Sequence, residues 1–257
     1  MAQIRPLIEP SGKAPWLAAG IGLAWLLSLI LCLTLDLSSI HPALVVAAVL
    51  VRTFLQTGLF IVGHDAMHRL LLPMRPRLNH QLGALALGLY GALPYQPCLL
   101  NHHRHHRAPG SDSDPDGHGG QSDSLFSWYW RFMAGYLSWR QMAGLLSGWG
   151  LLAFAVGGQS PTAAITQVLL FCTLPLLLSS WQLFLVGTYL PHRRQSTLVC
   201  THQVGSLDWP VWVSLLACYH FGYHREHHES PELCWFQLPM AHGNQQQRPL
   251  APLIFAR

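Results

Sequence analysis

The sequence predicts an all-α protein that crosses a membrane several times, and three observations support this fold class. Hydrophobic residues make up 51% of the 257 residues and charged residues only 10%, compared with about 25% in an average soluble domain. Four long segments contain almost no charge. The chain also holds 16 histidines, more than its 15 Lys and Arg or its 11 Asp and Glu. We expect one membrane-integral domain over residues 1–257, with about four transmembrane helices and a histidine-rich cytoplasmic cap.

The four uncharged segments are long enough to cross a bilayer. A helix rises about 1.5 Å per residue, so about 20 residues span a hydrocarbon core of about 30 Å. Residues 15–35 and 42–63 are predicted to form one hairpin, in which Arg52 is the only charge. Residues 140–157 and 162–188 are predicted to form a second hairpin, because neither segment holds a charged residue after Arg140.

A fifth segment, residues 78–100, is also uncharged but is rich in glycine. The turns at 36–41 and 157–161 contain no Lys or Arg, so the positive-inside rule places both termini and every histidine cluster in the cytoplasm. Residues 78–100 must then leave from and return to the same side, as a re-entrant or interfacial segment or as a tight double pass. The aromatic segment 125–136 is predicted to be a helix at the membrane surface.

The histidines follow helical spacing on the predicted cytoplasmic side. His64 and His68 are four residues apart, and two HxxHH clusters at 102–106 and 224–228 place residues i, i+3 and i+4 on one helix face. Imidazole is a common ligand for iron, zinc, copper and nickel. Eight imidazoles exceed the needs of one ion, no cysteine accompanies them as in many zinc sites, and the ExxH pairs of soluble di-iron bundles are absent. The pattern predicts an all-histidine di-iron site that activates oxygen.

Two further features have competing interpretations. The acidic stretch 112–118 could hold a cation, but it lacks the complete calcium-loop pattern; a turn stabilised by Asp side chains, or support for metal-binding imidazoles, explains it as well. Arg52 lies one helical turn from Gln56 inside a predicted span. Because intramembrane charge usually faces a cavity or a partner, these two residues are candidates for a substrate pocket.

The histidine pattern resembles that of the membrane di-iron superfamily of fatty-acid desaturases, alkane monooxygenases and carotenoid oxygenases. Within it, the chain is most similar to the bacterial and cyanobacterial β-carotene ketolases, over about residues 15–240. Arg69, where the family has glycine, is a local departure outside the histidine positions. The resemblance rests on the blocks Thr57–His68, Leu89–Tyr95, Asp114–Asp116 with His118, Phe132–Trp139, Tyr189–His192, Cys218–Glu229 and Trp235–Pro239.

This resemblance implies oxidation of C4 and C4′ of β-ionone rings. β-Carotene would give echinenone and canthaxanthin, and zeaxanthin would give astaxanthin, by two successive hydroxylations and loss of water. The implied cofactors are two iron ions, with O2 as co-substrate and electrons from a reductase–ferredoxin system. The carotenoid would come from the lipid bilayer. We therefore expect a tunnel lined by aromatic and small residues, open to lipid, with residues 78–100 and 125–136 as its walls.

The resemblance also implies roles for individual residues. His220 is either a further ligand or a neighbour of the ligands, and five acids are candidates for holding the distal imidazole nitrogens: Asp65, Asp114, Asp116, Glu226 and Glu229. Tyr90 and Tyr95 join Arg52 and Gln56 as substrate-pocket candidates. The implied metal ligands are His64, His68, His102, His105, His106, His192, His224, His227 and His228.

Three alternative functions are weighed against this one. A carotene hydroxylase or a lipid desaturase of the same superfamily would carry the same histidines. A histidine-rich membrane metal transporter would need polar residues along the spans, which hold few beyond Arg52 and Gln56. Nucleic acid is not expected as a partner, because the net charge of +4 comes from scattered arginines and one lysine.

Overall fold

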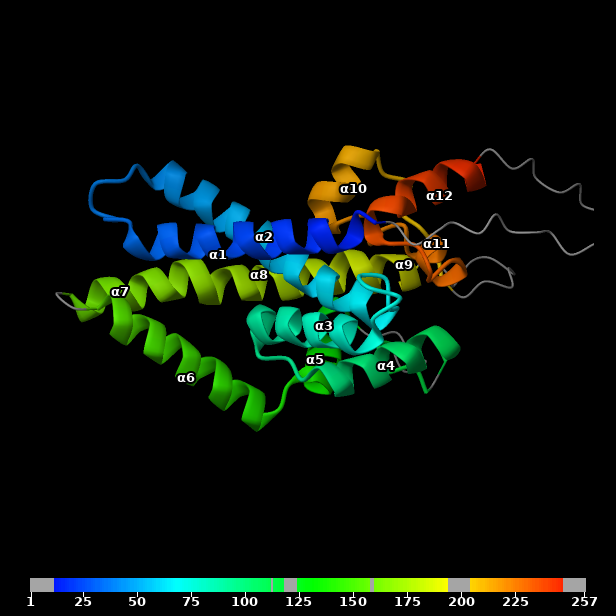
Figure 1. The fold of residues 1–257 in the computed structure, drawn as a ribbon, viewed down its shortest axis with the longest axis horizontal. Coiled ribbons are helices and arrows are strands. Elements are labelled where there is room, and N and C mark those ends of the chain that lie inside the picture. The colour runs from blue at the N-terminus through cyan, green and yellow to red at the C-terminus, as the bar shows by residue number, and fades with distance from the viewer. Residues whose placement is uncertain (1–11, 112, 118–123, 158–159, 194–203, 247–257) are drawn as a thin grey trace, which may run out of the picture.

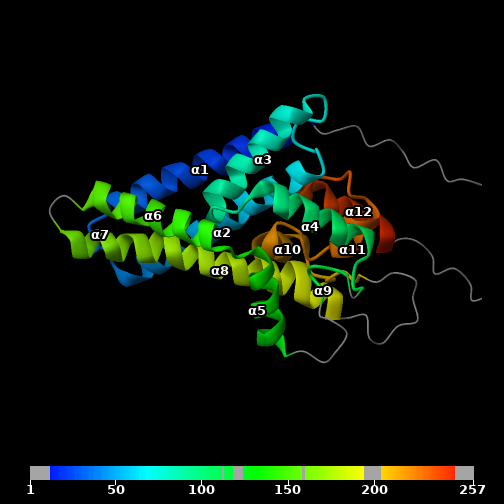
Figure 2. The same cartoon turned by 90° about the horizontal axis from the view of Figure 1, so that it is seen from below.

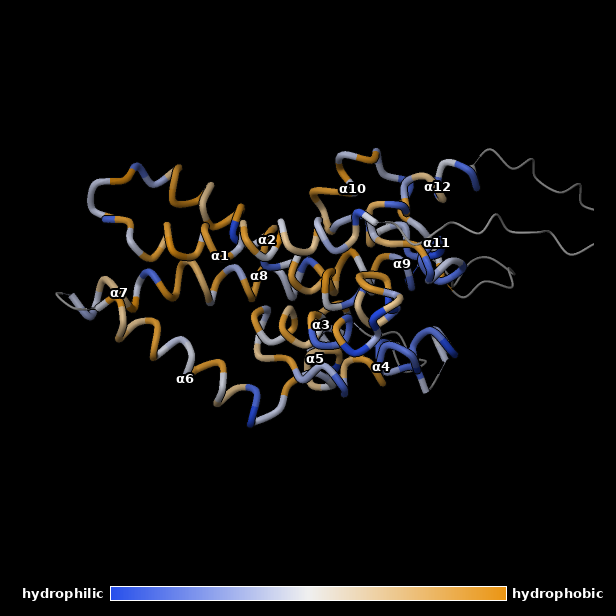
Figure 3. Tube along the Cα trace, viewed as in Figure 1, coloured by the Kyte–Doolittle hydropathy of each residue, from blue (hydrophilic) through white to orange (hydrophobic). Residues whose placement is uncertain are grey.

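The computed structural model describes residues 12–111, 113–117, 124–157, 160–193 and 204–246. All regular secondary structure in these residues is helical, which confirms the predicted all-α class. Figure 1 shows an elongated molecule in which long helices run along its length and several short helices gather at one end. In Figure 3 the long helices are mostly hydrophobic and the gathered short helices are more polar.

The first two long helices form the predicted first hairpin. α1 spans Ala14–Thr34 and α2 spans Pro42–Met67. The Asp36 carboxylate stabilises the turn between them, because it accepts hydrogen bonds from the backbone amide and the hydroxyl of Ser38 at 3.0 and 2.7 Å. α2 continues past residue 63, the predicted end of the span, so the same continuous helix carries His64 into the polar end of the molecule.

The third long helix runs from Pro161 to Arg193 and contains two π-helical segments. Each segment lies just before a proline, Pro175 or Pro191. A proline ring clashes with the carbonyl four residues earlier and supplies no N–H, so the helix widens there into single π-helical turns. The parts are α7 (Pro161–Val168), η1 (Leu169–Thr173), α8 (Leu174–Gln182), η2 (Leu183–Tyr189) and α9 (Leu190–Arg193).

The prediction of four transmembrane helices is confirmed only in part. Within the described residues, three helices are long and apolar enough to cross a membrane: α1, α2 and the helix Pro161–Arg193. The fourth predicted span, 140–157, is present as the 18-residue helix α6 (Trp139–Val156), which packs against α7. It is too polar to join these three, because its first turn carries Arg140 and Gln141 and three glycines follow.

The segment 78–100 is not one helix but part of a helical hairpin. α3 (Pro76–Gly91) ends at Ala92, whose left-handed backbone (φ 53°) turns the chain, and α4 (Tyr95–Arg107) follows. α4 returns to the end of the molecule from which α3 starts, as Figures 1 and 2 show together. The segment therefore doubles back, as expected of a segment that leaves and returns on one side.

The remaining helices cover the polar end. The predicted aromatic helix is present as α5 (Leu125–Tyr136). α10 (Val211–Cys218) ends in two left-handed residues, Tyr219 and His220 (φ 48° and 65°), which redirect the chain into α11 (His224–Glu229). A short 3-10 turn, η4 (Trp235–Gln237), leads into α12 (Leu238–Gln246), which packs against α11. This arrangement brings α11 beside α4 and the end of α9 (Figure 2).

Candidate metal centre

The structure brings the nine predicted histidines together in two groups. The first group draws on α2 and its C-terminal residue, α4 and α11, and the second on α4, α9 and α11. Within each group, one ring nitrogen from every histidine lies within 4.8 Å of the others. The first group consists of His64, His68, His102, His106 and His227, and the second of His105, His192, His224 and His228.

The two HxxHH clusters are divided between the groups in a reciprocal way. In α4, the outer pair His102 and His106 belongs to the first group and His105 to the second. In α11, the outer pair belongs to the second group and His227 to the first. At 3.6 residues per turn, i+4 lies about 40° to one side of i and i+3 about 60° to the other, so within one face the pair i and i+4 points in a different direction from i+3. Each of these two helices therefore contributes to both groups.

Distances between the ring nitrogens match those expected around a shared ion. Nε2 of His68 lies 2.7 Å from Nε2 of His102, and the same atoms of His106 and His227 are 2.9 Å apart. In the second group, Nε2 of His228 lies 3.0 Å from Nε2 of His105. A metal–nitrogen bond of about 2.1 Å, as for zinc, separates ligands at right angles by about 3.0 Å. The spacing fits a metal ion in each group.

Several of these nitrogens are buried without a hydrogen-bond partner. Both ring nitrogens of His64 and Nδ1 of His224 are in this state, although buried polar atoms are almost always hydrogen-bonded. Nδ1 of His64 approaches a carboxylate oxygen of Asp65 only to 3.6 Å. A bound cation would satisfy the nitrogens that face into the groups, so the residues present fit a two-metal site.

The protonation states also favour metal binding. Burial lowers the pKa of His68 to about 3, and burial together with the neighbouring histidines lowers the pKa of His106 to about 2. The same two causes hold the pKa of His102 and His227 well below the usual range. Neutral imidazole is the form that binds metals. These rings are therefore neutral at pH 7, and each has a free nitrogen lone pair that can bind a metal ion.

Asp114 holds the ring of His105. Nδ1 of His105 donates to the buried carboxylate of Asp114, at 2.9 and 3.0 Å from its two oxygens, which leaves Nε2 to face the second group. The same carboxylate accepts from the backbone amides of Gly110 and Asp116 at 2.7 and 2.9 Å. The acidic loop is therefore both a turn and a support for a predicted ligand. Asp112 and His118 of this loop lie outside the described residues.

Two other acid candidates lie near the groups without bonding a clustered ring. Asp116 accepts a hydrogen bond from the Tyr136 hydroxyl at 2.8 Å, and its backbone carbonyl accepts from the Trp128 indole at 3.0 Å. Asp65 accepts from the Trp235 backbone amide at 3.4 Å. Both carboxylates are buried and stabilise the elements around the groups.

The remaining candidates point away from the groups. Glu226 bonds Ser206 and accepts from Nδ1 of His242 at 3.0 Å. Glu229 accepts from the Gln245 amide at 2.6 Å. His220 belongs to neither group, because its left-handed backbone turns the ring against Tyr223, with the ring centres 5.8 Å apart.

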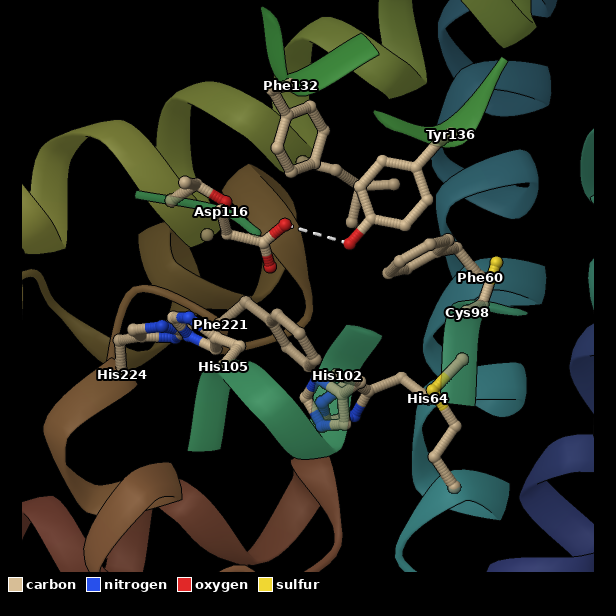
Figure 4. A pocket seen from close by; sticks show the side chains of 14 residues that line it. Phe60, His64, Cys98, His102, His105, Asp116, Phe132, Tyr136, Phe221 and His224 are labelled. Carbon is tan, nitrogen blue, oxygen red and sulfur yellow. Dashed lines mark hydrogen bonds between the residues drawn. The ribbon is translucent and has the colours of Figure 1, made fainter. Parts of the chain in front are cut away.

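A narrow pocket beside the histidines adjoins an apolar cavity. Figure 4 shows His102, His105 and His224 on one side of this pocket, with Phe132 and Tyr136 opposite. The apolar cavity has a volume of about 340 Å³, and its lining is almost entirely apolar and aromatic. Four side chains belong to both spaces and form a neck between them: Phe60, Phe132, Tyr136 and Leu183.

Comparisons with known proteins agree with this geometry. A model of the fatty acid desaturase family matches residues 40–252. A β-carotene ketolase of Paracoccus sp. (strain N81106) is 38% identical over 229 residues, which cover 88% of this chain and 87% of that protein. A second one, of Paracoccus sp. (strain PC1), is 39% identical over 228 residues, covering 87% and 89%. The chain belongs to the β-carotene ketolases of the fatty acid desaturase family.

A more distant member of this group is the zeaxanthin 4-ketolase of Chlamydomonas reinhardtii. It is 36% identical over 208 residues, which cover 77% of this chain and 44% of that protein. A comparison with solved structures finds no match.

The four substrate-pocket candidates of this ketolase-family chain lie in different surroundings. Tyr90 lines the apolar cavity and also a second cavity, which Arg52 and Gln56 line as well. Tyr95 lines none of the cavities found in the described residues; its hydroxyl pairs with Nδ1 of His80 at 2.9 Å.

Sequence reasoning missed His242, which supports the third histidine cluster. Besides bonding Glu226, its ring stacks on Tyr223 with centres 4.2 Å apart and an interplanar angle of 14°. Both contacts lock α12 onto α11. His242 lies 16 residues from Glu226, outside any helical or motif spacing, so no pattern in the sequence pointed to it.

Proposed function

We propose that this chain is an oxygen-dependent β-carotene 4-ketolase that draws its substrate from the membrane. The observation that carries the proposal is the apolar cavity that meets the two histidine groups through an aromatic neck. A rod-like polyene is soluble in lipid, and ligand sites are mostly apolar with a few placed polar groups. The cavity suits such a molecule, and the neck suits one ionone ring.

The residues of this chain position the reacting ring and exclude water. Phe60 and Phe132 give the neck flat apolar walls, and the hydrogen bond to Asp116 fixes the ring of Tyr136. Asp114 fixes the orientation and tautomer of His105. We assign the nine clustered histidines as ligands of two iron ions, which would activate O2 for two successive hydroxylations at C4 before loss of water gives the ketone.

The proposal places the histidine end of the molecule in the cytoplasm, in one membrane-integral domain over residues 1–257. α2 packs against α1, α3 and α8, so the long helices share one body. The turn between α1 and α2 lies at the opposite end from the histidine helices (Figure 1). α6 would be the fourth crossing, because Leu146, Leu151 and Phe154 expose apolar side chains along it.

Pigment analysis tests this function. The gene is expressed in a bacterial host that makes β-carotene, and pigments are separated by chromatography; we expect 4-ketone and 4,4′-diketone. His102→Ala should abolish the ketones, while His103→Ala should not, because His103 is exposed and belongs to neither group. Zeaxanthin or newly unsaturated lipid without any ketone would instead assign the chain to the hydroxylases or desaturases.

Metal and electron supply need their own measurements. Purified protein should contain two irons per chain, and His105→Ala should lose iron together with activity. A stable content of one zinc would contradict the assignment, and a metal flux across vesicles would favour a transporter. We propose a ferredoxin-type protein as the electron donor. Purified ferredoxin and its reductase should sustain ketone formation in isolated membranes.

A further inference from the structure

A second cavity lies next to the apolar one and shares part of its lining. Its volume is about 280 Å³, and α1, α2, α3, α6 and the π-helical segment before α8 contribute to its walls. Tyr90, Leu145, Trp149 and Leu176 line both cavities. The pocket at the histidines, the apolar cavity and this second cavity therefore form a row.

The row follows α2 from His64 to Arg52. Twelve residues of helix separate these positions, which corresponds to about 18 Å. An extended C40 carotenoid is longer than this. A molecule with one ring at the histidines must therefore place its other end in the second cavity or past it.

Arg52 is the charged residue that lines the second cavity, together with the polar Gln56. Its side chain is 1% exposed, and its guanidinium lies 5.0 Å from the centre of the Trp25 ring. Nε donates to the carbonyl of Phe171 at 3.0 Å. Pro175, four residues later, has no backbone N–H to offer this carbonyl. Nη1 donates to the Trp25 carbonyl at 2.8 Å and to the Ser28 hydroxyl at 3.0 Å.

The other amino group of Arg52, Nη2, has no hydrogen-bond partner within the described part of the chain, and no described carboxylate pairs with the residue. An N–H of a charged group that has no hydrogen-bond acceptor in apolar surroundings lowers the stability of the protein. An oxygen atom of a ligand in this cavity would meet that donor.

The α6 wall leaves room for such a ligand. Gly144 and Gly148 line the second cavity, and a Cβ built on either meets no atom within 4 Å. Gly88 of α3 also lines this cavity, and a Cβ built on it likewise meets no atom within 4 Å. Without side chains at these glycines, the helix surfaces are flat and open enough to pack against the face of a carotenoid end ring.

We propose that the second cavity binds the carotenoid end ring that is not being oxidised, and that Nη2 of Arg52 donates to the 4-keto oxygen of a ring already oxidised. The inference rests on the proposed ketolase activity. It explains how a monoketone would be held with its unreacted ring at the histidines, so that the second oxidation follows the first.

The first test compares two substrates in isolated membranes, β-carotene and its 4-monoketone, each supplied separately. A hydrogen bond from a charged donor should lower the KM of the monoketone about tenfold relative to β-carotene. Arg52→Lys should remove this preference, because lysine keeps a cation but lacks Nη2, and the monoketone should accumulate. Equal KM values in the wild type, or a preference unchanged in Arg52→Lys, would overturn the role of Arg52.

The second test blocks the cavity without touching Arg52. Gly148→Leu should raise the KM of both substrates at least fivefold, on the order of the loss expected for a filled ring site. Gly150→Leu is the matched control, since Gly150 lies on the same helix, is open, and lines none of the three cavities. Equal KM values for the two variants would refute ring binding there. Failure of the wild type to form any ketone would instead refute the proposed function.

Discussion

Asp114→Asn should weaken the second histidine group without unfolding the chain. The Asp114 carboxylate is 0% exposed and lies 2.9 and 3.0 Å from Nδ1 of His105. Asparagine has nearly the same shape and can still accept one backbone amide. It removes the negative charge, however, and replaces one carboxylate oxygen by an NH2 group. That NH2 group would face an N–H that the oxygen now accepts from.

The magnitude follows from the number and kind of bonds that change. Hydrogen bonds to charged groups contribute about 1.5–3 kcal/mol, which corresponds to about 10- to 150-fold in affinity. Loss of a partner that orients a metal-bound histidine typically costs about 10- to 100-fold in metal affinity. We therefore expect Asp114→Asn to lower the affinity of one iron site by about this factor, and ketone formation with it.

The assay is iron content after dialysis against graded concentrations of a chelator, with ketone formation measured on the same samples. Asp114→Asn should lose about one of two irons at chelator concentrations that leave the wild type intact. Ser113→Ala is the control in the same loop, because Ser113 is exposed and its hydroxyl bonds that of Ser111 among the residues the structure describes. Iron retention by Asp114→Asn equal to that of Ser113→Ala would refute the supporting role of Asp114.

Three further predictions concern the surroundings of the groups. Chelation of all metal should lower the melting temperature of the detergent-solubilised protein, because buried nitrogens such as those of His64 lose their partner; an unchanged melting temperature would contradict a two-metal site. His242→Phe keeps an aromatic ring on Tyr223 but leaves the buried Glu226 one donor short, so stability should fall by about 1–3 kcal/mol in chemical unfolding. Tyr136→Phe should slow ketone formation about tenfold by freeing Asp116 in the pocket at the histidines, whereas Tyr95→Phe, which loses a bond to His80 outside the three cavities, should not.

Much of the fold could be predicted because its signals are local. The run of apolar residues places α1 and α2 within a few residues, and the aromatic segment 125–136 coincides with α5. The segment 140–157 is a helix as predicted, but Arg140 and Gln141 in its first turn and the three glycines after them keep its hydropathy below that of the other three long helices. The π-helical turns before Pro175 and Pro191 have no periodic signature that marks them in advance.

The candidate site was predictable to a similar depth. Helical spacing singled out the three histidine clusters, and the structure brings them together. The roles of the acids could not be assigned, because they depend on contacts between distant elements: Glu226 and Glu229 meet α12, and Asp116 meets Tyr136 of α5. The role of His242 could not be predicted for the same reason, since only folding brings it to Glu226.

The HxxHH spacing has a consequence for how two ions can be held together. Adjacent helix faces are rigidly linked, so the angle between residue i+3 and the pair i and i+4 is set by the helix itself. α4 gives its pair His102 and His106 to the first group and His105 to the second, and α11 does the reverse with His227. Two helices that each bridge both groups fix the separation of the groups, without a bridging carboxylate from the described residues. α2 and α9 then complete one group each, which leaves the side toward Phe60 and Tyr136 open to the neck where the ring must enter.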